Sequence, residues 1–101
     1  MDEADGIQDK IRSLQARISS LEGTQRELER ALEEIDHQGR RVADRIERAG
    51  GNDREAEAEQ RQLADRRKAN QRDHLGNSRE LDRLRAEAAE LQRRIDELRR
   101  G

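Results

Sequence analysis

The chain has 101 residues, of which 46% are charged, 30% are hydrophobic and none is aromatic. So little apolar surface excludes an ordinary globular core and leaves either disorder or long helices that bury only a narrow seam. The formal net charge of −2 excludes a strong overall field that would attract nucleic acid or an anionic membrane. The absence of cysteine excludes disulfides and thiol chemistry.

The first half of the chain carries apolar residues at alternating steps of four and three, which is the heptad pattern of a coiled coil. Only Gln25 and Gly39 break the apolar character of this seam. Its members are Ile7, Ile11, Leu14, Ile18, Leu21, Gln25, Leu28, Leu32, Ile35, Gly39, Val42, Ile46 and Ala49. The pattern, together with the absence of proline, predicts a helix over residues 7–49.

A turn is predicted at residues 50–52. Glycine adopts the left-handed conformation that ends many helices, and Gly50 and Gly51 follow the first seam directly. Asn52 followed by Glu55 is a capping-box pattern, which predicts a second helix over residues 53–100. A short turn places consecutive helices antiparallel, so the expected fold is all-α, a single antiparallel two-helix coiled-coil hairpin.

The register of this hairpin can be tested on the sequence. If the turn centres on residue 51, the seam of the second helix brings Ile95 opposite Ile7 and Asn77 opposite Gln25. The second seam is strongly apolar over residues 81–98 and mostly polar over 56–77. Because the polar Gln25 meets a polar partner, the pattern favours an intramolecular hairpin.

The sequence also predicts weak points near residues 23 and 76. A further capping-box pattern follows each of Gly23 and Gly76, namely Thr24 with Glu27 and Asn77 with Glu80, and glycine inside a helix costs about 1 kcal/mol relative to alanine. Either both helices tolerate one glycine, or both kink there. Kinks would divide the hairpin into a base (7–22 with 78–100) and a tip (24–75).

A partner-binding surface is predicted on the tip. The first helix presents large aliphatic side chains there, whereas the second offers His74, Asn70, Arg67 and Gln60 opposite them. The aliphatic residues are Leu28, Leu32, Ile35, Val42 and Ile46. A half-covered apolar stripe favours docking of a helical protein or a second copy, which would give a dimer. The alternative is a marginal, wet tip without a partner.

Few residues suggest chemistry. Glu34 and His37 have the Glu-x-x-His spacing of di-iron bundles, but the heptad places them on the outer face and the second helix supplies no counterpart. His74 is either a pH-sensitive seam layer or a half-buried side chain that reaches solvent. No phosphate-binding loop or nucleophile motif is present. We therefore expect no catalytic residue, no metal and no cofactor, and a protein that is not an enzyme.

A basic cluster in the second helix raises the alternative of a nucleic-acid-associated coiled coil. Its members are Arg61, Arg66, Arg67, Lys68 and Arg72. Asp65 dilutes the charge, and there is no aromatic side chain on which bases could stack, so nucleic-acid binding is expected to be weak or absent. A solvated face with intrahelical ion pairs explains the cluster equally.

The leading hypothesis is a structural protein-protein interaction module. A second hypothesis is a helper or component of a bacterial secretion system, because helical hairpins of about this length occur among type VII secretion substrates and helpers. The resemblance is one of size and shape, since those proteins typically carry Trp-x-Gly at the turn and this chain has no tryptophan. The acidic start and the lack of a long apolar run predict a cytoplasmic protein without a membrane span, with signal-independent secretion as the alternative.

Overall fold

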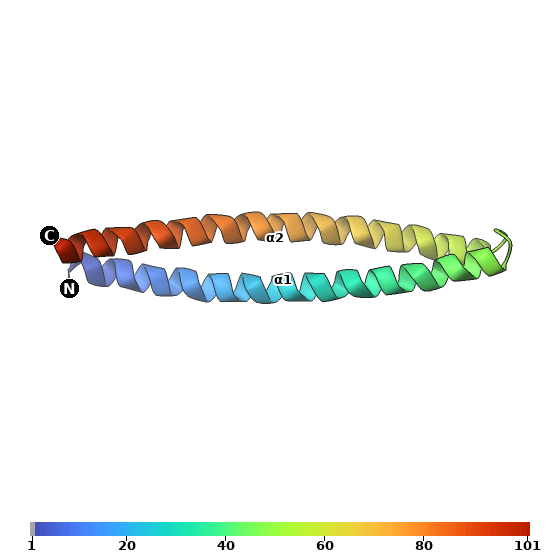
Figure 1. The fold of residues 1–101 in the computed structure, drawn as a ribbon, viewed down its shortest axis with the longest axis horizontal. Coiled ribbons are helices and arrows are strands. Elements are labelled where there is room, and N and C mark those ends of the chain that lie inside the picture. Colours follow the sequence, from blue (N-terminus) through green and yellow to red (C-terminus); the bar gives the residue numbers. More distant parts are fainter. Residues whose placement is uncertain (1) are drawn as a thin grey trace. The chain divides into compact units, whose positions relative to one another are not determined.

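The computed structural model describes residues 2–101 and contains two helices joined by a short turn. Helix α1 spans Glu3–Arg48 and helix α2 spans Arg54–Arg100 (Figure 1). No strand occurs among the described residues. The helices pack against each other with opposite chain directions, and this confirms the predicted all-α helical hairpin.

Helix α1 begins earlier than the residue 7 predicted from the seam. The carboxylate of Asp2 accepts a hydrogen bond from the backbone N–H of Asp5 at 2.9 Å and so caps the first turn. The acidic side chains of Glu3 and Asp5 also lie in this turn, where the helix dipole favours negative charge. The extension depends on capping rather than burial, which explains why the apolar pattern did not show it.

The end of α1 is a glycine-dependent Schellman motif. Gly50 and Gly51 both have positive φ angles, of 65° and 83°. The N–H of Gly50 donates to the carbonyl of Glu47 at 3.1 Å, and the N–H of Gly51 donates to the carbonyl of Ile46 at 3.0 Å. These two bonds satisfy carbonyls that the helix end would otherwise leave unpaired. The predicted role of the glycines in ending the first helix is confirmed.

The start of α2 differs from the prediction by one residue. Asp53, and not Asn52, caps the helix, because its carboxylate accepts the backbone N–H of Ala56 at 2.9 Å. The predicted capping box of Asn52 and Glu55 is therefore wrong. Asp and Asn cap helices about equally well, so the adjacent pair gave no basis for choosing between them.

Neither mid-chain glycine ends a helix. Helix α1 continues through Gly23, and α2 continues through Gly76. No new helix begins at the capping-box patterns that follow them. Each helix therefore tolerates its glycine and continues through it.

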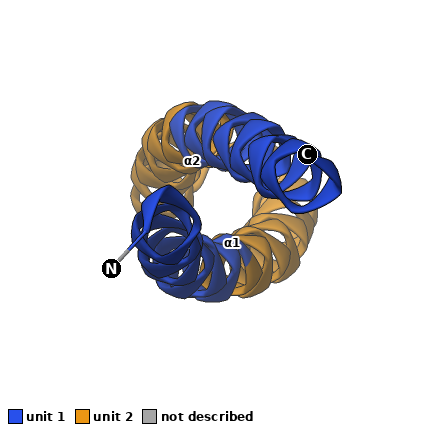
Figure 2. Ribbon diagram, turned by 90° about the vertical axis from the view of Figure 1, so that its left-hand side faces the viewer, with its two compact units in different colours: residues 1–25, 76–101 blue, residues 26–75 orange. Residues whose placement is uncertain are grey.

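The hairpin divides into two compact units, coloured in Figure 2. Unit 1 comprises residues 1–25 and 76–101, and unit 2 comprises residues 26–75. In unit 1 the buried apolar residues are Ile11, Leu81, Leu84 and Ile95. In unit 2 they are Ile35, Val42, Ala56 and Leu63, with Ile46 packed against them. Each unit thus has its own apolar seam between α1 and α2.

A polar layer in unit 1 confirms the predicted register. The side-chain amide of Asn77 donates to Oε1 of Gln25 at 2.7 Å and to the backbone carbonyl of Leu21 at 3.0 Å. Gln25 and Asn77 are the pair that the sequence placed opposite each other. A polar layer of this kind favours one alignment of two helices, because any shift would leave its groups without their partners.

Exposed ion pairs across the seam accompany this register in both units. In unit 1 they are Arg94–Glu3, Arg17–Glu80 and Arg85–Glu22. In unit 2, Arg67 pairs with Asp36 and Arg45 pairs with Glu59. Ion pairs at the surface contribute little to stability because water screens them, so these pairs support the antiparallel alignment without dominating its stability.

Candidate functional site

The five residues predicted to bind a partner do not form one open stripe. Ile35 and Val42 are buried, with exposed fractions of 5% and 6%. Leu28, Leu32 and Ile46 are half-buried. A substitution at Ile35 or Val42 would therefore disturb the packing of the hairpin as well as any partner.

Helix α2 covers the stripe in spite of its polar seam. Ala56 and Leu63 pack with Ile35 and Val42 in the unit 2 core. Gln60 and Arg67, which the seam pattern placed opposite aliphatic residues, are exposed instead. The guanidinium of Arg67 turns to the carboxylate of Asp36 on α1. Long polar side chains can leave a seam in this way and let smaller neighbours close it.

One polar residue stays inside the unit 2 seam. Asn70 has an exposed fraction of 7% and donates from Nδ2 to the backbone carbonyl of Leu28 at 3.0 Å. Its Oδ1 has no hydrogen-bond partner among the described residues. An unpaired buried acceptor destabilises a fold by about 1–3 kcal/mol, so this layer carries an energetic cost.

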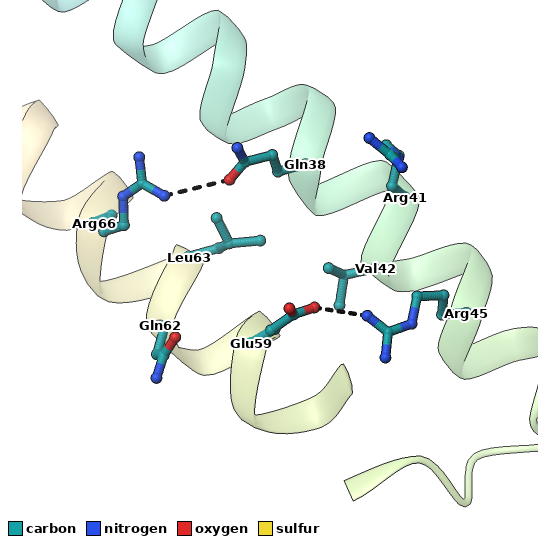
Figure 3. A pocket seen from close by; sticks show the side chains of 8 residues that line it. All are labelled: Gln38, Arg41, Val42, Arg45, Glu59, Gln62, Leu63 and Arg66. Carbon is teal, nitrogen blue, oxygen red and sulfur yellow. Dashed lines mark hydrogen bonds and ion pairs between the residues drawn. The ribbon is translucent and has the colours of Figure 1, made fainter. Parts of the chain in front are cut away.

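A hollow of about 450 Å³ opens on one face of unit 2, and we call it the unit 2 hollow. Its floor is apolar, formed by Val42 from α1 and Leu63 from α2 (Figure 3). The rim is polar. The rim residues are Gln38, Arg41, Arg45, Glu59, Gln62 and Arg66. Of the five predicted partner-binding residues, only Val42 lines it.

Two polar bridges cross from α1 to α2 over this floor. At one end Arg66 Nη1 donates to Gln38 Oε1 at 3.3 Å, and at the other Arg45 Nη1 donates to Glu59 Oε2 at 2.9 Å (Figure 3). Helical spacing accounts for the arrangement, because residues three or four apart on a helix share a face. Gln38 and Arg45 therefore flank Val42, and the bridges leave the space between them open.

Positive charge predominates around the hollow. The lining contains three arginines and one glutamate. Arg45 is neutralised by Glu59 and also lies 3.6 Å from Asp53. Arg66 binds only the neutral Gln38, and Arg41 forms no hydrogen bond or ion pair with any residue from 2 to 101. Two guanidinium groups thus keep uncompensated charge beside an apolar floor.

The shifted pKa values lie away from the hollow, in unit 1. A hydrogen bond from Arg83 lowers the pKa of Glu80, and the nearby charge of Arg17 acts in the same direction. The same bond raises the pKa of Arg83, and a hydrogen bond to Glu90 raises that of Arg93. These are exposed ion pairs on a helix surface, which perturb a pKa without marking a catalytic site.

The other candidate groups do not assemble into a site. Glu34 and His37 are both exposed, and the side-chain amide of Gln38 donates to Glu34 at 2.9 Å. Residues 2–101 contain no group of three or more potential ligands that could hold a metal ion. His74 is half-buried. No helix in the described part of the chain is long and apolar enough to cross a membrane.

The basic cluster of α2 is divided between different faces. Arg66 reaches toward the hollow, and Arg67 is neutralised by Asp36. Arg61, Lys68 and Arg72 are exposed. The cluster therefore does not present its five cations as one surface.

Sequence reasoning missed most of the hollow because it followed apolar residues only. Arg41, Arg45 and Gln62 are polar and lie beside the seam rather than in it. A usable signal was present, since Gln38 and Arg45 lie four residues before and three residues after Val42, on the same helix face. The space above Val42 stays open because the cross-helix bridges form on either side of it. The side-chain positions that decide this cannot be read from the spacing of residues in the sequence.

No protein-family model, curated protein or solved structure matches this chain.

Proposed function

We propose that this chain is a non-enzymatic interaction module that docks a helical protein through unit 2. The observation that carries the proposal is the unit 2 hollow, an open space with an apolar floor held between two cross-helix bridges. Docking of an amphipathic helix into an apolar groove is a common mode of recognition, in which apolar side chains at i and i+4 enter the groove.

The composition of the hollow favours binding over catalysis. Its lining includes no serine, threonine, cysteine or histidine, and its one carboxylate, that of Glu59, is held by Arg45. A nucleophile or a general base needs such a group free to reach a substrate. The division of the basic cluster between faces argues against the nucleic-acid alternative, because phosphate recognition needs several cations on one surface.

Photo-cross-linking from a single engineered cysteine tests this proposal, since the natural chain has none. Gln62→Cys, on the exposed rim of the hollow, carries a benzophenone label; Gln15→Cys, exposed on α1 in unit 1, is the matched control. In a lysate of the native host, we expect irradiation to give one discrete adduct from position 62 and none from position 15.

The mass of the adduct identifies the kind of partner. An adduct of twice the chain mass would indicate a second copy, and any other discrete mass would indicate a different protein. Adducts from position 15 alone, or equal labelling of many proteins from both positions, would contradict docking through unit 2.

A further inference from the structure

We infer that the unit 2 hollow takes an acidic amphipathic helix of a different protein, whose apolar side chains contact Val42 and Leu63 and whose carboxylates meet Arg41 and Arg66. This inference rests on the proposed docking function. It adds that the partner helix is acidic and belongs to a different protein.

The floor sets the apolar requirement. Val42 and Leu63 are already almost fully covered by the hairpin, with exposed fractions of 6% and 9%, so they offer a small apolar patch rather than a broad one. The two bridges limit the patch at both ends (Figure 3). One or two aliphatic side chains one helical turn apart, about 5–6 Å, match such a space better than a wide hydrophobic face.

The rim sets the charge requirement. Arg41 forms no bond with a described residue, and Arg66 binds only an uncharged amide. A guanidinium group binds carboxylates through two parallel hydrogen bonds, which adds geometric selectivity to the charge attraction. A helix that carries Asp or Glu beside its apolar positions would satisfy both arginines, whereas a basic helix would be repelled by them.

The same charge argues against a second copy on this face. A two-fold contact places identical surfaces together. If the two hollows faced each other, Arg41 and Arg66 of one copy would approach the same positive surface of the other, and Glu59, the one carboxylate of the lining, is already paired with Arg45. A contact that joins the two hollows is therefore disfavoured, whereas an acidic helix supplies the opposite charge.

A titration with three synthetic helical peptides tests the inference on the full chain. The peptides share leucines at i and i+4 and differ only in the flanking residues, which are glutamate, glutamine or lysine. With isotope-labelled methyl groups, we expect the glutamate peptide to shift the resonances of Val42 and Leu63. The glutamine peptide should bind more weakly, and the lysine peptide should not bind.

Two charge-reversal variants test whether binding depends on an arginine of the rim. Arg41→Glu should weaken binding of the glutamate peptide by roughly tenfold, because attraction becomes repulsion at the rim. Arg61→Glu, an exposed arginine of α2 outside the hollow, should leave the affinity unchanged. Equal effects of the two variants would show that only the overall charge of the chain matters and would overturn the inference.

The remaining outcomes separate this inference from the proposed function. Equal binding of all three peptides at Val42 and Leu63 would overturn the charge requirement while docking through unit 2 stands. Shifts at other residues, or none with any peptide, would overturn the inference, and the cross-linking from position 62 would then decide the docking function independently. Stronger shifts by a short duplex DNA than by the glutamate peptide would assign the arginines to phosphate instead.

Discussion

Leu84→Ala is expected to lower the free energy of unfolding by about 2–5 kcal/mol, the usual cost of removing a buried leucine side chain. Leu84 is 2% exposed and, with Ile95, is among the largest fully buried side chains. A two-helix hairpin has few such residues, so each one supplies a large share of a stability that is small in any domain. Urea titration followed by far-ultraviolet circular dichroism measures the change.

Leu75→Ala is the matched control, because the same atoms are removed from a side chain that is 51% exposed. Surface substitutions usually change stability by less than about 0.5 kcal/mol, and alanine is at least as good a helix former as leucine. A similar loss in the two variants would contradict the assignment of Leu84 to the seam of unit 1.

Asn70→Leu is expected to raise the free energy of unfolding by about 1–3 kcal/mol, since it removes a buried acceptor that has no partner. The carbonyl of Leu28 loses the donor from Asn70, but it keeps the ordinary helical hydrogen bond of its own turn. The gain should appear as a higher midpoint of urea unfolding with an unchanged slope.

Asn77→Leu is the comparison that makes this prediction specific. Asn77 donates to both Gln25 and the carbonyl of Leu21, so its loss removes two hydrogen bonds and should destabilise the fold by about 0.5–1.5 kcal/mol per bond. The two substitutions are thus expected to change the free energy of unfolding in opposite directions, although both asparagines lie in the seam. Destabilisation by both variants would show that Asn70 Oδ1 is satisfied in solution, as a bound water would do.

Asn70 is better explained by the alignment of α1 with α2 than by stability. Polar residues in coiled-coil seams favour one register, and Asn70 occupies such a position in unit 2, where large aliphatic residues on α2 are few. Together with the Gln25–Asn77 layer in unit 1, it gives each unit a polar contact that a shifted pairing would break.

The hairpin was predictable because its signals are periodic and local. The seam beginning at Ile7 and the glycines after Ala49 indicated two helices and a turn, and the Gln25–Asn77 contact confirms the register read from them. The helix starts were less accurate, because Asp2 and Asp53 act through single capping bonds that leave no periodic trace. Neighbouring residues with equal capping ability cannot be ranked from sequence.

The candidate site was predictable only in part. Of the residues that the seam pattern marked as partner-binding, Val42 lines the hollow, whereas Ile35 is buried in the unit 2 core. The difference arises because Gln60 and Arg67 point out of the seam, and this depends on the length and solvation of their side chains rather than on their spacing. The uncompensated charge of Arg41 likewise follows from which cross-helix pairs form.

The mass in solution tests the central claim most directly, namely that the chain pairs with itself as a hairpin and leaves the unit 2 hollow for a different protein. Light scattering with refractive-index detection suits a chain without aromatic residues. We expect a single mass of 11.7 kDa that does not change with concentration. A mass near twice that value would contradict it, because the form in solution would then not be a single hairpin.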